Sequence, residues 1–187
     1  APFIVAQGLL AQGEDMRGVV LRGIDPAREP EVTDLGVAMR SGALGRLVPG
    51  GFGIVLGSEL ARLLGVREGD ALTLIAPSGQ VTPAGVVPRM KQMQVVGLFD
   101  SGHYEYDATL AMLHIDDAAR IFRLEGPSGV RLKLRDLHQA RDVATDLMGT
   151  LSGQPVVRDW TRQNRTWFAA RSEEHTSELQ SRQYLVC

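Results

Sequence analysis

The stretch that decides the fold is residues 53–115, which read GIVLGSELARLLGVREGDALTLIAPSGQVTPAGVVPRMKQMQVVGLFDSGHYEYDATLAMLHI. It predicts a short helix at 59–64, strands at 71–76, 92–99 and 109–115, and a long loop at 77–91. No part of it combines a nucleophile, a base and metal ligands. What it offers is shape and apolar surface, which indicates a binding or transmission module.

The loop at 77–91 carries the clearest functional signal. A loop of this length inside a compact domain is usually functional or disordered. Proline stiffens the backbone and methionine adapts to varied partner surfaces, so we favour a stiff projecting arm with an apolar face. The alternative is a loop folded back onto its own sheet. The residues behind this prediction are Pro77, Pro83 and Pro88, with Val81, Val86, Val87 and Met90.

The remaining chain alternates between strand and helix patterns, which predicts an α+β fold. Ser58 is a candidate N-cap for the helix at 59–64, and Asp116 or Asp117 for the helix at 118–123. A glycine-rich turn region is expected at 42–53. Further strands are expected at 2–10, 16–24, 130–134 and 155–157, and further helices at 32–39, 137–148 and 160–170.

The order of these elements predicts two lobes. Residues 1–31 and 116–170 form a layered α/β lobe, and residues 32–115 form a strand-rich lobe inserted into it. The last helix carries Trp160, Trp167 and Phe168. Tryptophan favours places where one ring edge is apolar and the other wet, so this helix suits either packing under the sheet or a membrane interface.

Composition excludes several classes of function. The 187 residues have a net charge of −2 and no basic stripe, so nothing supports nucleic-acid binding. No apolar run is long enough to cross a bilayer, and no signal region opens the chain. A phosphate-binding loop is absent, so we do not expect the chain to hydrolyse ATP. Because the chain begins with Ala1 inside a strand-like pattern, we expect it to be a fragment.

The tail at 171–187, RSEEHTSELQSRQYLVC, departs from the composition that precedes it. It resembles the translation of a common sequencing adapter, and we expect it to be an artefact, the alternative being a polar linker. The single cysteine, Cys187, lies in this tail. The rest of the chain has no cysteine, which is compatible with an oxidising compartment.

Candidate catalytic and metal-binding residues have simpler structural roles. The run His103-Tyr104-Glu105-Tyr106-Asp107 predicts a polar turn whose tyrosines pack beside a strand, since three such close-spaced residues rarely reach one metal. His114 and His138 stand alone. Ser58 lacks the second glycine of a nucleophile elbow. The sequence therefore predicts no enzyme activity, no cofactor and no metal.

Several motifs, in order, resemble the periplasmic domain of the LolC/LolE family, the membrane subunits of bacterial lipoprotein-releasing ABC transporters with a MacB-like periplasmic core. The resemblance runs through nearly all of residues 1–170. It rests on Pro2-Phe3, Gln7-Gly8-Leu9-Leu10, Gly23-Ile24-Asp25-Pro26, Gly57, Leu60-Ala61, Leu64-Gly65-Val66, Gly69-Asp70, Thr82-Pro83, Gly85, Pro88-Arg89, Lys91, Val95-Val96-Gly97, Phe99, Tyr106-Asp107, Asp159-Trp160, Asn164 and Phe168-Ala169.

The resemblance implies a two-lobed domain in the periplasm, with membrane helices before Ala1 and after Ala170. It implies release of outer-membrane lipoproteins to a soluble periplasmic carrier, a partner permease subunit, and a separate cytoplasmic subunit that consumes ATP. In LolC-type members the loop matching 77–91 is a hook that engages the carrier. The candidate partner-binding residues are accordingly Pro83, Val86, Val87, Pro88, Arg89 and Met90.

The resemblance leaves the particular role open. The LolC-type hook has Pro-Met at its tip where this chain has Pro83-Ala84, so LolC-like, LolE-like and hybrid subunits all remain. A MacB- or FtsX-like module that only transmits force is another alternative. The segment 60–70 also resembles the helix–Gly-Asp–strand unit of double-psi barrels, which would make it a ligand-binding lobe of an enzyme.

Overall fold

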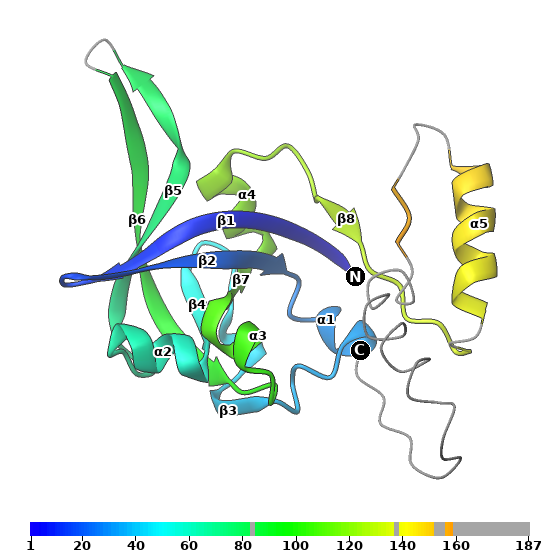
Figure 1. The fold of residues 1–187 in the computed structure, drawn as a ribbon, viewed down its shortest axis with the longest axis horizontal. Coiled ribbons are helices and arrows are strands. Elements are labelled where there is room, and N and C mark those ends of the chain that lie inside the picture. The colour runs from blue at the N-terminus through cyan, green and yellow to red at the C-terminus, as the bar shows by residue number, and fades with distance from the viewer. Residues whose placement is uncertain (83–84, 137–138, 152–155, 159–187) are drawn as a thin grey trace, which may run out of the picture. The chain divides into compact units, whose positions relative to one another are not determined.

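The structure is a computed structural model that describes residues 1–82, 85–136, 139–151 and 156–158. The chain divides into two compact units, Ala1–Leu132 and Lys133–Cys187. All the described strands lie in the first unit (Figure 1). The described helix of the second unit is α5 (Ala140–Thr150).

Six strands of the first unit pair in a closed ring. β1 (Pro2–Gln12) pairs with β2 (Asp15–Ile24), which pairs with β7 (Leu110–His114). The ring continues through β4 (Gly53–Gly57), β6 (Gly85–Phe99) and β5 (Ala71–Thr82), which returns to β1. The β2–β7 and β4–β6 pairs are parallel and the other four are antiparallel.

Two shorter strands extend the sheet outside this ring. β3 (Met39–Gly42) pairs with β6, and β8 (Gly129–Val130) pairs with the start of β1. The β8 pairing brings residues far apart in sequence together, with Phe3 opposite Gly129.

Alternation of side chains along the strands gives the ring two apolar faces. The inward residues form the main core, which includes Ile4, Leu10, Leu21, Leu56 and Leu74. A second cluster lies on the outer face and includes Ile24, Leu44, Val55, Phe99 and Met112. Since a strand's side chains point alternately to opposite faces, one strand such as β4 can supply both clusters.

Short helices cover the ring. α2 (Ser58–Leu64) and α3 (Tyr104–Thr109) pack on each other, and α4 (Ile115–Phe122) packs on β1, β2, β5 and β7. α1 (Glu29–Val32) and the 3₁₀ turn η1 (Leu44–Arg46) lie in the connections that flank β3. α2 ends at Gly65, whose φ of 66° is the left-handed conformation expected of a glycine C-cap.

The strand predictions at 2–10, 16–24, 71–76, 92–99 and 109–115 are confirmed, and so is the helix at 59–64. The helix predicted at 32–39 is wrong. α1 ends at Val32, Thr33 is extended, and Met39 joins β3 because it pairs with Phe99 of β6. The strand β4 lies partly in the region predicted as turns, since pairing with β6 and β7 outweighs the local glycine signal.

The capping predictions are also corrected. Gly57 occupies the N-cap position of α2, so Ser58 is the first helical residue. α4 is capped by His114, whose Nδ1 accepts a hydrogen bond from the backbone N–H of Asp116 at 3.2 Å. Asp117 is buried and bonds elsewhere.

The C-terminal predictions have mixed outcomes. The strand at 130–134 shrinks to Gly129–Val130, and the helix at 137–148 is found at Ala140–Thr150. The strand at 155–157 is not found at its described positions, 156–157. The helix at 160–170 and the tail at 171–187 lie outside the described residues. Strands from both predicted lobes pair within the one ring, and the division into lobes stays a prediction.

Candidate functional site

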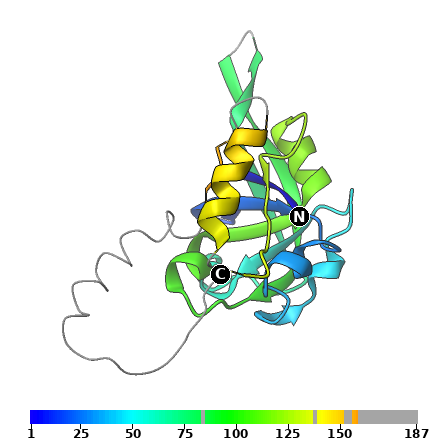
Figure 2. The ribbon, with the colours of Figure 1, turned by 90° about the vertical axis from the view of Figure 1, so that its right-hand side faces the viewer.

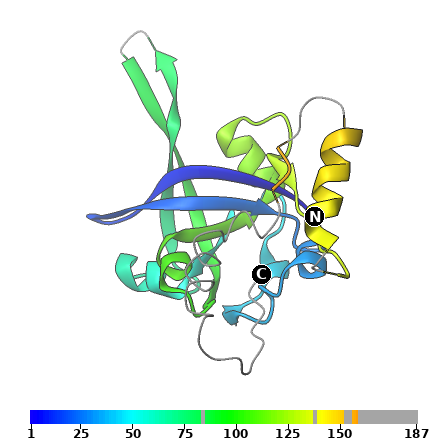
Figure 3. The same ribbon diagram turned by 45° about the vertical axis from the view of Figure 1, so that its right-hand side comes forward.

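The feature that stands out from the ring is a two-stranded antiparallel ribbon, residues 76–82 and 85–89, formed by the far ends of β5 and β6. β5 pairs with β1 only at Thr73, Leu74 and Ile75, and β6 pairs with β4 only from Gln94 onward. Between these limits the two strands pair with each other. Figures 1, 2 and 3 show the ribbon extending away from the rest of the first unit.

The ribbon replaces the irregular loop predicted at 77–91. Regular pairing runs from Ala71↔Gln94 to Ala76↔Arg89, and resumes with Gln80↔Val87 after a register shift. Pro77 and Pro88 lie within this shift, between its two regular pairs. Proline has no N–H to donate to a ladder and is tolerated at edges and bulges, so it marks the irregular point rather than ending the strands. The predicted projection is found, in the form of a ribbon.

The candidate partner-binding residues fall in different places on the ribbon and at its base. Pro83 lies outside the described residues. Val86 and Val87 pair through their backbones with Val81 and Gln80. Pro88 is exposed, and Met90, the next outward position, is 65% exposed. An exposed proline and methionine provide an apolar surface next to the ring.

Arg89 points the opposite way from Met90. Because side chains alternate along a strand, Arg89 and Lys91 share the inward face with the buried Met93. The Arg89 Nη1 donates a hydrogen bond to the carbonyl of Ile121 in the last turn of α4, at 3.4 Å. The Lys91 Nζ lies 3.5 Å from the centroid of the Phe52 ring, a cation–π contact.

The Phe52 ring is held in place by Asp117 of α4. Asp117 is fully buried, and its two carboxylate oxygens accept hydrogen bonds from the backbone N–H groups of Gly50 at 2.8 Å and Phe52 at 3.0 Å. Phe52 has a φ of 48°, the left-handed region that a bulky residue rarely adopts. The loop before β4 is thus pinned to α4 by a buried carboxylate.

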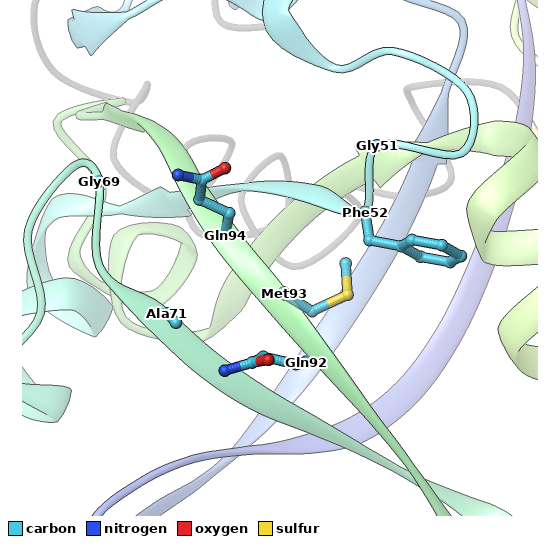
Figure 4. Close-up of a pocket in the computed structure, with 7 residues that line it drawn as sticks. All are labelled: Gly51, Phe52, Gly69, Ala71, Gln92, Met93 and Gln94. Carbon is cyan, nitrogen blue, oxygen red and sulfur yellow. The ribbon is translucent and has the colours of Figure 1, made fainter.

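A shallow open depression of about 310 Å³ lies beside this loop, lined by Gly51, Phe52, Gly69, Ala71, Gln92, Met93 and Gln94. Figure 4 shows Met93 directed toward Phe52, whereas the amides of Gln92 and Gln94 lie on the other side of the strand. None of the lining side chains titrates. The depression therefore carries no acid–base or nucleophilic chemistry.

The buried carboxylates serve the fold. Asp107 accepts hydrogen bonds from the N–H of Ser101 at 2.8 Å and its hydroxyl at 2.9 Å. Glu29, 1% exposed, accepts from Arg131 Nη1 at 3.1 Å. Burial, reinforced by the neighbouring Arg131, lowers the pKa of Arg22.

Chemistry-bearing clusters are missing from the described part of the chain. No group of three or more His, Cys, Asp or Glu residues there could hold a metal ion. Tyr104 and Tyr106 are 64% and 53% exposed, so the prediction that they pack beside a strand is wrong; they lie on the outer side of α3.

No helix among the described residues has the length and apolar character needed to span a bilayer.

Two solved structures share the fold of this chain. The periplasmic region of MacB from Actinobacillus actinomycetemcomitans matches 95% of this chain and 76% of its own, with a TM-score of 0.53 and 10% identity. The extracellular domain of the ABC-type transporter YknZ from Gram-positive bacteria matches 84% of this chain and 79% of its own, with a TM-score of 0.50 and 15% identity. The α+β, MacB-like fold class is confirmed.

Comparison with relatives in sequence is more specific than the similarity in fold. No family model matches the chain. It is 46% identical over 172 residues to the lipoprotein-releasing system transmembrane protein LolC of Neisseria meningitidis, and 42% identical over 176 residues to LolC of Xylella fastidiosa. Identity to the LolE protein of Haemophilus influenzae is 24% over 161 residues.

These matches confirm the resemblance to the LolC/LolE family over most of this chain. The first two cover 91% and 94% of it, and the LolE match covers 86%. The chain spans about two-fifths of the length of the relatives it matches, with covered shares of 41%, 42% and 38%.

Proposed function

We propose that the chain is the periplasmic domain of a LolC-type permease subunit in the bacterial inner membrane. The transporter releases outer-membrane lipoproteins and passes them to a soluble periplasmic carrier. The transporter also contains a partner permease subunit and a cytoplasmic subunit that consumes ATP. The domain itself is not catalytic. The observation that carries the proposal is a projecting ribbon on a chain with 42–46% identity to LolC proteins.

The comparison between relatives favours a LolC-type role over a LolE-type role. Identity is 46% to the Neisseria LolC protein, and within Haemophilus influenzae it is 33% over 124 residues to LolC against 24% over 161 residues to LolE. The Pro83-Ala84 tip lacks the methionine of the LolC-type hook, which alone would leave the LolE-like role open. The support for a LolC-type role is the 42–46% identity over most of this chain.

The ribbon and its base suit docking to a carrier. A paired ribbon already has its backbone ordered, so less conformational entropy is lost on binding than with a flexible loop. Pro88 and Met90 expose apolar surface at the base, and a carrier that holds acyl chains must itself present apolar surface. The proposed partner-binding residues are Pro83, Val86, Val87, Pro88, Arg89 and Met90, of which Arg89 faces inward at the base and would act through the ribbon.

Calorimetric titration with the purified periplasmic lipoprotein carrier tests this proposal. The ribbon variant replaces Pro83, Val86, Val87, Pro88 and Met90 with Gly or Ser and keeps Arg89. The matched control, Val37→Ser with Val48→Ser, removes apolar side chains that are 88% and 51% exposed elsewhere on the first unit. Circular dichroism and thermal melts check that both variants fold.

We expect saturable binding by the parent chain and the control, and at least about a tenfold loss in the ribbon variant, as expected for loss of an interface hot spot. Equal binding by the ribbon variant would remove the docking assignment. A folded parent chain that fails to bind the carrier would favour a LolE-like or force-transmitting role.

A further inference from the structure

The ribbon has little support from other strands where it leaves the ring. A two-stranded ribbon is marginally stable alone, and among the described residues no third strand pairs with 76–82 or 85–89. The register shift between Ala76 and Gln80 interrupts its ladder immediately beyond the base. The direction of the ribbon therefore depends on a side-chain contact at its base.

Arg89 makes a contact of this kind. It pairs with Ala76, the last regular pair before the shift, and its side chain turns inward to the carbonyl of Ile121. Ile121 lies in the last turn of α4, where carbonyl groups lack partners within the helix and the helix dipole favours a cation. The Arg89 Nε is buried without a hydrogen-bond partner. Burying a guanidinium group that is not fully paired costs free energy. A side chain that served only to contact a partner would not need to be buried in this way.

The other end of this contact is itself fixed. Asp117 bonds α4 to the backbone at Gly50 and Phe52. Ala118 packs closely on β2: a Cβ added at Gly23 would lie 2.7 Å from the Cβ of Ala118. α4 is therefore anchored to the loop before β4 and to β2, and its last turn provides a firm support for the ribbon. In Figure 3 α4 lies close to the base of the ribbon.

We infer that Arg89 is a positioning residue that sets the direction of the ribbon by tying its base to the end of α4. Pro88 and Met90, on the outward face, remain free for a partner while Arg89 acts from behind them. This refines the role of Arg89 within the proposed docking function. The direction of the ribbon is a property of the domain alone, so it can be measured whether or not a carrier binds.

Spin-label distance measurements test the inference directly. Labels are placed at Gln80→Cys in the ribbon and at Arg67→Cys, an exposed position before β5, in a chain with Cys187→Ser. The Arg89→Ala variant should give a wider, shifted distance distribution at an unchanged melting temperature. Arg89→Lys should keep the narrow distribution, because an ammonium group can still donate to the Ile121 carbonyl. Met90→Ala, which removes the neighbouring outward side chain, is the matched control and should also keep it.

Carrier affinity supplies a second readout, which rests on the proposed function. If only a tenth of the Arg89→Ala ribbons keep the competent direction, affinity falls about tenfold. An unchanged distance distribution in Arg89→Ala would overturn the inference. A loss of carrier affinity with that unchanged distribution would make Arg89 a direct contact residue instead. A parent chain that does not bind the carrier would contradict the proposed function alone, since the distances still report on Arg89.

Discussion

The Asp117 carboxylate and the Phe52 backbone N–H, 65 positions apart in sequence, form a hydrogen bond of 3.0 Å that fixes the loop before β4 to α4. The second oxygen of the same carboxylate bonds Gly50. This pair of bonds places the Phe52 ring under Lys91, next to the base of the ribbon. One buried side chain thus organises the surroundings of the candidate site.

We predict that Asp117→Ala destabilises the domain by about 2–4 kcal/mol, since it leaves two backbone donors without partners in a buried place. Asp117→Asn should lose nearly as much, because one of its two terminal atoms becomes a donor that faces an N–H group. Urea denaturation measures the change. Asp116→Ala, at a side chain that is 60% exposed, is the control and should change stability little. Equal stabilities for the Asp117 and Asp116 variants would contradict the buried role.

The contact between Lys91 and Phe52 should be detectable as a coupling energy. Phe52→Leu and Lys91→Met each remove the cation–π contact while keeping an apolar side chain. A double-mutant cycle should give a coupling of about 0.5–2 kcal/mol, the range for exposed to desolvated cation–π pairs. Additive effects of the two substitutions would show that the 3.5 Å approach contributes nothing to stability.

Asp100 should contribute to the acid limb of stability. The Gly102 N–H, which donates to its carboxylate at 3.0 Å, lowers the pKa of Asp100, and Arg40 lowers that pKa further. A carboxyl group with a lowered folded-state pKa stabilises the fold above its unfolded value, near pH 4, and loses this contribution as pH falls through the folded pKa.

Urea denaturation between pH 7 and pH 2.5 checks this. Wild type should exceed Asp100→Asn in stability above about pH 5, and the gap between the two curves should narrow progressively as the pH falls below about 4. Glu125→Gln, at an exposed position after α4, is the control and should follow wild type throughout. A gap between wild type and Asp100→Asn that does not narrow as the pH falls below about 4 would point to an effect other than ionisation.

Gly57→Ala should strongly disrupt the packing of α3. A Cβ at this position would collide with the carbonyl oxygen of Asp107 and would lie 2.7 Å from the Asp107 Cα, and both are backbone atoms that cannot rotate away. Overpacking of this kind costs about 1–3 kcal/mol or more. Gly36→Ala, where a Cβ would meet nothing within 4 Å, is the matched control. Thermal unfolding of the two variants gives the comparison, and similar midpoints would contradict the close approach of α3.

The sequence predicted the long strands well because their alternation is read directly from neighbouring residues. It could not predict that 77–91 is mostly paired. Three prolines argue locally against a strand, whereas pairing between β5 and β6 depends on residues across the ribbon. The same limit applies to β4, whose glycines favour turns but whose place between β6 and β7 makes it fully buried.

The sequence predicted where the projecting arm lies in the chain, but not which way its side chains point. Proline, valine and methionine around 83–90 indicated an apolar arm. The inward direction of the Arg89 side chain follows from the register of β6, which is set by its pairing with β5. The contact between Arg89 and Ile121 joins residues 32 positions apart, and the supporting role of Asp117 spans 65 and 67 positions. No local pattern marks such contacts.

The closed ring also sets the order in which the chain can fold. Of the six ring strands β1 comes first in the chain, and β2 can join it at once, but its other ring partner, β5, begins at Ala71. Closure further requires β7, which ends at His114. In a chain delivered from its N-terminus, one edge of β1 must therefore wait for most of the domain before it is covered. Such long-range closure slows folding and leaves an unpaired edge open to wrong partners in the meantime.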